Sequence, residues 1–150
     1  MIRIISIPQL KDNFSYAILK NKKVIIIDPA ESISVLKYIE SESLTLEAIL
    51  LTHHHTDHTA GVKDILNKIK VPVYSPNKEI ECTTKIVKDK DIFEINSIKI
   101  EVISTPGHTI DHVVFYIKQN NISIDKIISI YFGGKLPFIL LNLFTHTVLN

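Results

Sequence analysis

Four of the seven histidines of this 150-residue chain lie within six positions, as His53, His54, His55 and His58. The apolar residues 48–51 directly before them have the composition of a buried strand. Apolar residues spaced as on one face of a helix follow: Val62, Ile65, Leu66 and Ile69. The histidine run is therefore predicted to lie on a loop between a strand and a helix, in a fold that contains both kinds of element.

Further strands are predicted along the whole chain by short runs rich in β-branched and aromatic residues. Turn-forming residues separate the first three runs, which predicts an antiparallel meander. The meander strands are expected at residues 2–7, 14–20 and 24–27, and the later strands at 71–74, 98–103, 113–117 and 122–130. Ser32 is expected to cap a helix with the apolar stripe Ile33, Leu36 and Ile39. The pattern indicates an α+β fold, with residues 1–150 forming one domain.

Charge and cysteine content narrow the choice of partners and location. The 17 basic and 16 acidic residues give a formal net charge of +1, so no strong field is expected to attract nucleic acid or an anionic membrane. The apolar segment 136–144 is too short to cross a bilayer. A single cysteine, Cys82, excludes an internal disulfide and suits a reducing compartment. With no signal peptide recognised at the start, a cytoplasmic location is expected.

The spacing of the histidine run predicts two adjoining metal positions. His53 and His55 are two residues apart on an extended segment, so both imidazoles project to one side and can bind one cation. Asp57 and His58 come where the chain turns into the helix and can bind a second cation beside the first. His54 points away from its neighbours and is expected to pack or to support a ligand.

A third ligand for the first cation must come from a distant strand, because one loop cannot surround two cations. His108 is the candidate, since Pro106 and Gly107 force a turn just after the strand at 98–103. His112 is expected to hydrogen-bond within this second loop. The alternative is a solvated histidine tract that binds metal adventitiously, and it does not require His108 to approach the first loop.

The motifs THHHTDHTAG at 52–61 and STPGHTIDH at 104–112 resemble the metallo-β-lactamase superfamily, and glyoxalase II in particular. The segments LKDNFSYAI at 10–18 and VIIIDPAE at 24–31 resemble the start of glyoxalase II, where an Asp-Asn-aromatic element precedes a strand ending in Asp-Pro. The resemblance covers roughly residues 1–118. It implies an αββα sandwich of two sheets flanked by helices, here shortened to its N-terminal half plus a divergent tail, without the helical domain that binds glutathione.

The resemblance also implies the chemistry. Two divalent metal ions, zinc foremost and otherwise iron or manganese, would provide an activated hydroxide that cleaves S-lactoylglutathione to lactate and glutathione. Carried over by position, the first metal would bind His53, His55 and His108, and the second Asp57 and His58. Asp28 would lie beneath the site and order the loop.

The rest of the family pattern is carried less completely by this sequence. Asp125 matches the aspartate that bridges both metals, although Ile124 replaces the usual glycine before it, and Asp111 replaces another glycine before His112. The other reading of Asp125 is a surface aspartate on a strand edge. The last histidine, His146, lacks the family's sequence context, and Lys135 is a candidate for contacting substrate.

Asp57 and Asp125 are accordingly the expected catalytic residues, and the partner is a small thioester. Two alternatives stay open: a non-catalytic metal-binding remnant of the same family, and another hydrolase of the same fold, acting on a β-lactam, a phosphodiester or a persulfide. An uncovered apolar sheet face would favour a homodimer.

Overall fold

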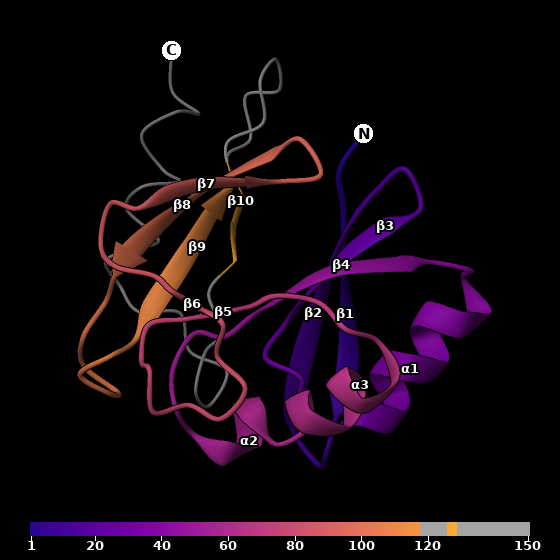
Figure 1. Ribbon diagram of the computed structural model, residues 1–150, viewed down its shortest axis with the longest axis horizontal. Coiled ribbons are helices and arrows are strands. Elements are labelled where there is room, and N and C mark those ends of the chain that lie inside the picture. The colour runs from indigo at the N-terminus through magenta and orange to yellow at the C-terminus, as the bar shows by residue number, and fades with distance from the viewer. Residues whose placement is uncertain (118–125, 129–150) are drawn as a thin grey trace.

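The computed structural model describes residues 1–117 and the strand residues 126–128. Its strands form two sheets, and its helices lie beside the first of them (Figure 1). The six-stranded sheet runs β1 (Arg3–Gln9), β2 (Asn13–Lys20), β3 (Lys23–Ile27), β4 (Thr45–Leu50), β5 (Val73–Ser75) and β6 (Lys85–Ile86). The four-stranded sheet has the order β10 (Lys126–Ile128), β9 (Val113–Ile117), β8 (Ile98–Ser104) and β7 (Ile92–Ile95). The helices are α1 (Ser32–Ser41), α2 (Thr56–Thr59) and α3 (Val62–Lys68).

The predicted meander is confirmed, since β1, β2 and β3 pair antiparallel in chain order. Strands β3, β4 and β5 then pair in parallel, with α1 in the first crossover and α2 and α3 in the second. A parallel pair needs such a crossover, which returns the chain to the starting edge of the sheet. As a result the ends of β3 and β4 emerge at the same edge, and the histidine run follows β4 there.

Three details of the sequence prediction were wrong. Helix α1 is capped by Glu31 rather than Ser32, which is already helical. Its buried residues are Val35 and Ile39, four apart, whereas Ile33 is 64% exposed. Strands β6 and β7 were not predicted: β6 has two residues, both exposed, and β7 buries only its last residue, so neither carries the usual apolar signal.

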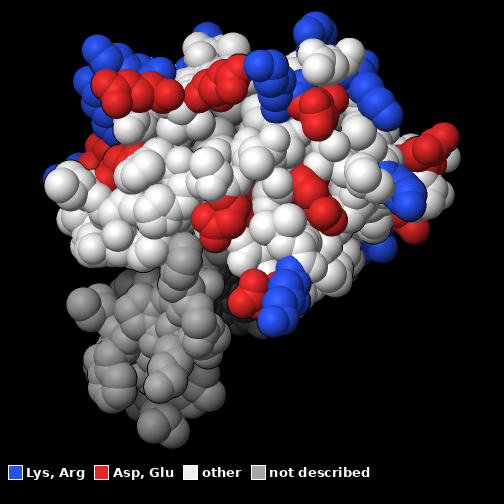
Figure 2. Space-filling model, turned by 90° about the horizontal axis from the view of Figure 1, so that it is seen from below, with Lys and Arg blue, Asp and Glu red and all other residues white. Residues whose placement is uncertain are grey.

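The visible surface mixes charges of both signs. Figure 2 shows lysine and arginine side chains next to aspartate and glutamate side chains on this face, with uncharged areas between them. No described helix reaches the length and apolar character needed to span a bilayer. The face in Figure 2 therefore offers no large area of one sign.

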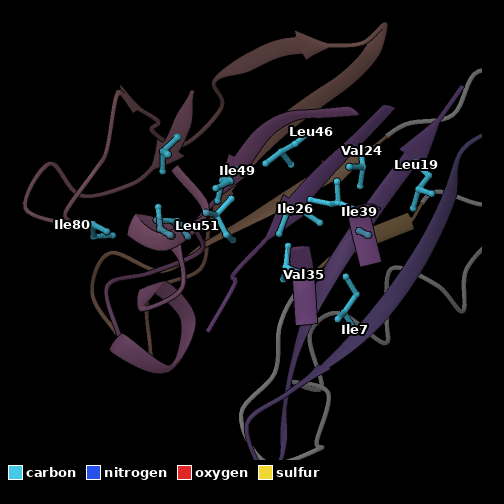
Figure 3. Packing of buried hydrophobic residues seen from close by; sticks show 14 residues of the cluster. Ile7, Leu19, Val24, Ile26, Val35, Ile39, Leu46, Ile49, Leu51 and Ile80 are labelled. Carbon is cyan, nitrogen blue, oxygen red and sulfur yellow. The ribbon is translucent and has the colours of Figure 1, made fainter. Parts of the chain in front are cut away.

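The core has two parts, one on each face of the six-stranded sheet. Strand β3 shows why, because its residues alternate between the faces. Ile25 and Ile27 pack against the second sheet, while Val24 and Ile26 pack toward the helices. Figure 3 shows the helix-side cluster, which includes these members: Ile7, Leu19, Val24, Ile26, Val35, Ile39, Leu46, Ile49, Leu51 and Ile80. The described residues thus form three of the four layers of the expected sandwich.

Gly61 joins α2 to α3 at a point where the backbone passes very close to the segment after β3. Its amide donates to the carbonyl of Pro29 at 2.9 Å. A Cβ added at Gly61 would lie 2.6 Å from the backbone carbon of Glu31 and 2.8 Å from the carbonyl oxygen of Pro29. Only glycine fits without a backbone shift.

Replacing Gly61 by alanine should therefore destabilise the protein by about 1–3 kcal/mol, the usual cost of overpacking. Gly107→Ala is the matched control, because a Cβ there meets nothing within 4 Å. Its free energy of unfolding should stay within about 1 kcal/mol of wild type. Urea unfolding of both variants measures the difference, and equal stabilities would contradict the close approach at Gly61.

Candidate metal centre

Two loops meet where the sheets adjoin. The first, which follows β4, carries Thr52 to His55 and leads into α2, and the second connects β8 to β9 and carries His108 and His112. The amide of Val113 donates to the carbonyl of Thr52 at 2.9 Å and ties the loops together. Ligand candidates 53 residues apart in the sequence are thereby brought side by side.

His53, His55 and His108 form one group. Their candidate ligand atoms all lie within 4.8 Å of one another. His108 Nε2 is 2.9 Å from His55 Nδ1, and the ring centroids of His53 and His108 are 5.2 Å apart. Three imidazoles this close together match the donor set of a zinc site with open positions. The sequence prediction that His108 approaches the first loop is confirmed.

Asp57 and His58 lie directly beside this group, on α2. His58 Nε2 is 3.6 Å from Asp57 Oδ2, and the His58 ring centroid is 4.4 Å from that of His53. A nitrogen and a carboxylate oxygen at this separation can be ligands of one cation with bonds of about 2.0–2.2 Å. The two groups therefore have the adjacency that paired metals need.

Asp28 supports both groups from below. It follows β3 with a φ of 49°, a left-handed conformation that aspartate tolerates, and it is 1% exposed. Its Oδ1 accepts a hydrogen bond from the Thr52 amide at 2.8 Å, and its Oδ2 accepts from Thr52 Oγ1 at 2.6 Å and from His58 Nδ1 at 3.0 Å. Asp28, His53 and His58 also satisfy the distance criterion for a ligand group. Because both Asp28 oxygens already accept hydrogen bonds, we assign Asp28 to positioning, as the resemblance implied.

These hydrogen bonds also set the proton positions on two histidines. Thr52 has one hydroxyl proton, which it donates to Asp28, so it accepts from His53 Nδ1 at 2.8 Å. His58 likewise donates from Nδ1 to Asp28. In the neutral form of each ring, Nε2 then carries the lone pair that a metal ligand requires.

Burial and the closeness of several titratable side chains shift the pKa values of the candidate ligands. Burial, followed by the neighbouring histidines, lowers the pKa of His53 to about 3, so this imidazole is neutral and needs no deprotonation before it binds a cation. Burial and His55 also lower the pKa of His108. Burial alone would lower the pKa of His58, but the hydrogen bond to Asp28 and the charges of Asp28 and Asp57 together raise it. Burial alone would raise the pKa of Asp57, but the Asn13 hydrogen bond and His58 lower it.

The remaining histidines of the two loops belong to neither ligand group. His54 is exposed, and its Nδ1 lies 2.9 Å from the carboxylate of Asp111. His112 is buried, and its Nδ1 lies 2.7 Å from Thr105 Oγ1 within the second loop, as predicted. Sequence reasoning missed the role of Asp111, which it noted only as a replaced glycine.

The sequence analysis also assigned no role to Asn13, although this residue belongs to the Asp-Asn-aromatic element on which the family resemblance partly rests. Its side-chain nitrogen lies 2.8 Å from the carbonyl oxygen of Asp57 and 3.1 Å from Asp57 Oδ2. The signal was present in the motif but carried no indication of its partner. Three other residues from the sequence analysis, Asp125, Lys135 and His146, lie outside the described residues.

Comparison with known proteins shows the family of this chain. The family model described as "Metallo-beta-lactamase superfamily" matches residues 10–123, and the chain belongs to this superfamily. Within it, the chain is similar to the hydroxyacylglutathione hydrolase of Idiomarina loihiensis, with 42% identity over 118 residues, 77% of this chain and 47% of that protein. It is also 40% identical over 118 residues to the enzyme of the same name from Klebsiella pneumoniae, again 77% of this chain and 47% of the relative. The chain spans about half the length of these curated relatives.

Solved structures support the fold. The B3 metallo-beta-lactamase BLEG-1 superposes with a TM-score of 0.69 at 22% identity, covering 77% of this chain and 67% of that one. ETHE1 from Myxococcus xanthus superposes with a TM-score of 0.66 at 22% identity, covering 78% of this chain and 53% of that one. The fold and family expected from the motifs are thus confirmed.

Asp28→Asn tests the support beneath the site. The amide keeps the volume but turns an acceptor into a donor that opposes Thr52 and His58, so zinc affinity should fall by about 10–100-fold. Competition against a chromophoric chelator measures it, with circular dichroism to verify folding. Asp111→Asn is the control, because Asp111 contacts His54 outside both ligand groups. An Asp28→Asn protein with wild-type zinc affinity would remove Asp28 from the site.

Proposed function

We propose that this chain is a metal-dependent hydrolase of thioesters that converts S-lactoylglutathione to lactate and glutathione. The observation that carries the proposal is the convergence of His108 on His53 and His55, directly beside Asp57 and His58. The curated relatives at about 40% identity, all named hydroxyacylglutathione hydrolase, favour thioesters over the other substrates of this superfamily. A fold alone would not select the substrate.

The metal content proposed is two divalent ions, with zinc as the first choice. His53, His55 and His108 would hold the first ion, and Asp57 and His58 the second, with Asp125 proposed as the bridge and Lys135 as a substrate contact. The donor set of imidazole and carboxylate fits zinc, and it also accepts iron and manganese. When bound, such a pair of ions lowers the pKa of water toward neutrality and polarises a carbonyl.

The protein's own residues would mainly orient the ligand side chains and supply negative charge to the site. Asp28 fixes the rings of His53, through Thr52, and of His58, so that their Nε2 atoms are presented without rearrangement. The Asp57 carboxylate, whose pKa is lowered, keeps a negative charge next to His58. A thiolate is a good leaving group, so the reaction needs no protein nucleophile and no strong general acid.

Asp57→Ala should reduce S-lactoylglutathione hydrolysis by about 100-fold or more, because it removes a ligand of the second ion, and even supporting residues typically cost 10–100-fold. Turnover is to be measured on zinc-loaded protein together with the zinc content per chain. His54→Ala is the control, since His54 lies outside both ligand groups, and it should keep wild-type turnover.

The same experiment separates the alternatives. Equal turnover in wild type and Asp57→Ala would remove Asp57 from the mechanism. Wild-type protein that binds zinc but hydrolyses no S-lactoylglutathione would instead favour the non-catalytic remnant, or, if it cleaves another substrate, a different hydrolase of this fold.

Cytoplasmic location and a homodimer complete the proposal. The single cysteine is compatible with a reducing compartment, and cell fractionation tests the location.

A dimer would cover apolar surface such as Ile92 on β7, which is 57% exposed. Sedimentation equilibrium should then give twice the chain mass of 17.0 kDa, and a monomer mass at high concentration would reject the dimer.

A further inference from the structure

The turn between β1 and β2 reaches across the sheet edge to α2. Asn13, the first residue of β2, lies 44 positions before Asp57 in the chain, yet its side-chain nitrogen contacts two oxygens of that residue. One is the backbone carbonyl oxygen at 2.8 Å, and the other is carboxylate Oδ2 at 3.1 Å. Both are acceptors only, so the NH2 end of the Asn13 amide must face them, with one N–H for each.

The carbonyl of Asp57 is available because α2 stops after one turn. In a continued helix the amide of Gly61 would donate to it. That amide donates instead to Pro29 at 2.9 Å, while the Ala60 amide bonds to Thr56. The Asn13 side-chain nitrogen therefore donates to this carbonyl in place of the missing helical amide. The same nitrogen also donates to the Asp57 carboxylate.

The start of β2 is itself fixed. Asn13 pairs with Gln9 at the end of the β1–β2 hairpin. Gln9 is 2% exposed, and its Oε1 accepts a hydrogen bond from the Glu31 amide at 2.8 Å. The hairpin end that carries Asn13 is thus anchored to the segment before α1.

The carboxylate of Asp57 needs such support more than its neighbour does. The His58 side chain is 4% exposed and held by Asp28, whereas the Asp57 side chain is 39% exposed on a four-residue helix. A half-exposed carboxylate without a lateral contact would sample several rotamers. The amide of Asn13 selects the one that places Oδ2 at 3.6 Å from His58 Nε2.

We propose that Asn13 is a positioning residue for the second metal position: it orients Asp57 toward the cation shared with His58 and leaves the first position untouched. This inference rests on the proposed two-metal function. It assigns a physical role to the Asn of the Asp-Asn-aromatic element. Loss of the amide should weaken the binding of the second ion only, because the Asn13 side-chain nitrogen donates to two oxygens of Asp57, which belongs to the second metal position.

The experiment is a zinc titration against competing chelators that resolves two binding steps, on wild type, Asn13→Ala and Asn13→Asp. Asn13→Ala should weaken the second step by about 10–100-fold and leave the first at its wild-type affinity. Asn13→Asp keeps the volume but replaces the donor by a second carboxylate, so its second step should be weakened at least as much. Asn77→Ala is the matched control: Asn77 also donates to a carboxylate near the histidines, that of Asp111 at 3.4 Å, and both zinc steps should be unchanged.

Thermal unfolding of the metal-free proteins distinguishes positioning from a general loss of structure. Asn13→Ala and Asn77→Ala should both remain folded, with Tm within a few degrees of wild type. Two zinc steps of wild-type affinity in Asn13→Ala, or an equal loss in both steps, would overturn the inference while the proposed function stands. A wild-type protein that binds a single zinc ion would overturn the two-metal function and the role of Asn13 with it.

Discussion

The hydrogen bonding of the buried Asp28 carboxylate is the interaction on which the candidate metal centre depends. A carboxylate that is 1% exposed is costly unless donors surround it, and here three hydrogen bonds do so. Two of them come from Thr52, at the point where β4 ends, and the third from His58. The carboxylate therefore holds the start of the histidine loop and the ring of His58 in a single hydrogen-bond network. Through Thr52 it also determines that the proton of neutral His53 lies on Nδ1. Without the carboxylate, all three of these donors would lose their acceptor.

The packing of the two sheets brings the loop between β8 and β9 close to the histidine loop, which the Asp28 hydrogen bonds alone would not do. Inward-facing residues of both sheets, such as Ile25, Ile100 and Phe115, are fully buried between them and hold the sheets face to face. The loop after β4 and the loop between β8 and β9 then lie side by side, joined by the bond from Val113 to Thr52. The approach of His108 to the first loop thus depends on sheet packing as well as on the local turn at Pro106 and Gly107.

The sequence predicted those features that depend on local pattern. Runs of β-branched residues located the meander and β9, and the spacing of His53 and His55 predicted that their side chains lie close together. Strand β6 could not be predicted, because two exposed residues carry no periodic signal. The contacts of Asn13 with Asp57 and of Asp111 with His54 span 44 and 57 positions, and no local pattern encodes such partners. The family resemblance identified the motif around Asn13 but not its partner.

Carboxylates hold two of the crowded histidines in different surroundings. His54 sits between two predicted ligands, and its ring centroid is 4.9 Å from that of His55. Asp111, which stands where the family has glycine, accepts from His54 Nδ1 and holds that exposed ring outside the cluster. Asp28 acts in the opposite direction on His58, because it binds Nδ1 from beneath and leaves Nε2 near Asp57. The same type of hydrogen bond thus holds one imidazole at the surface and the other beside Asp57, so the number of histidines in the run does not by itself predict which of them lie in the candidate ligand groups.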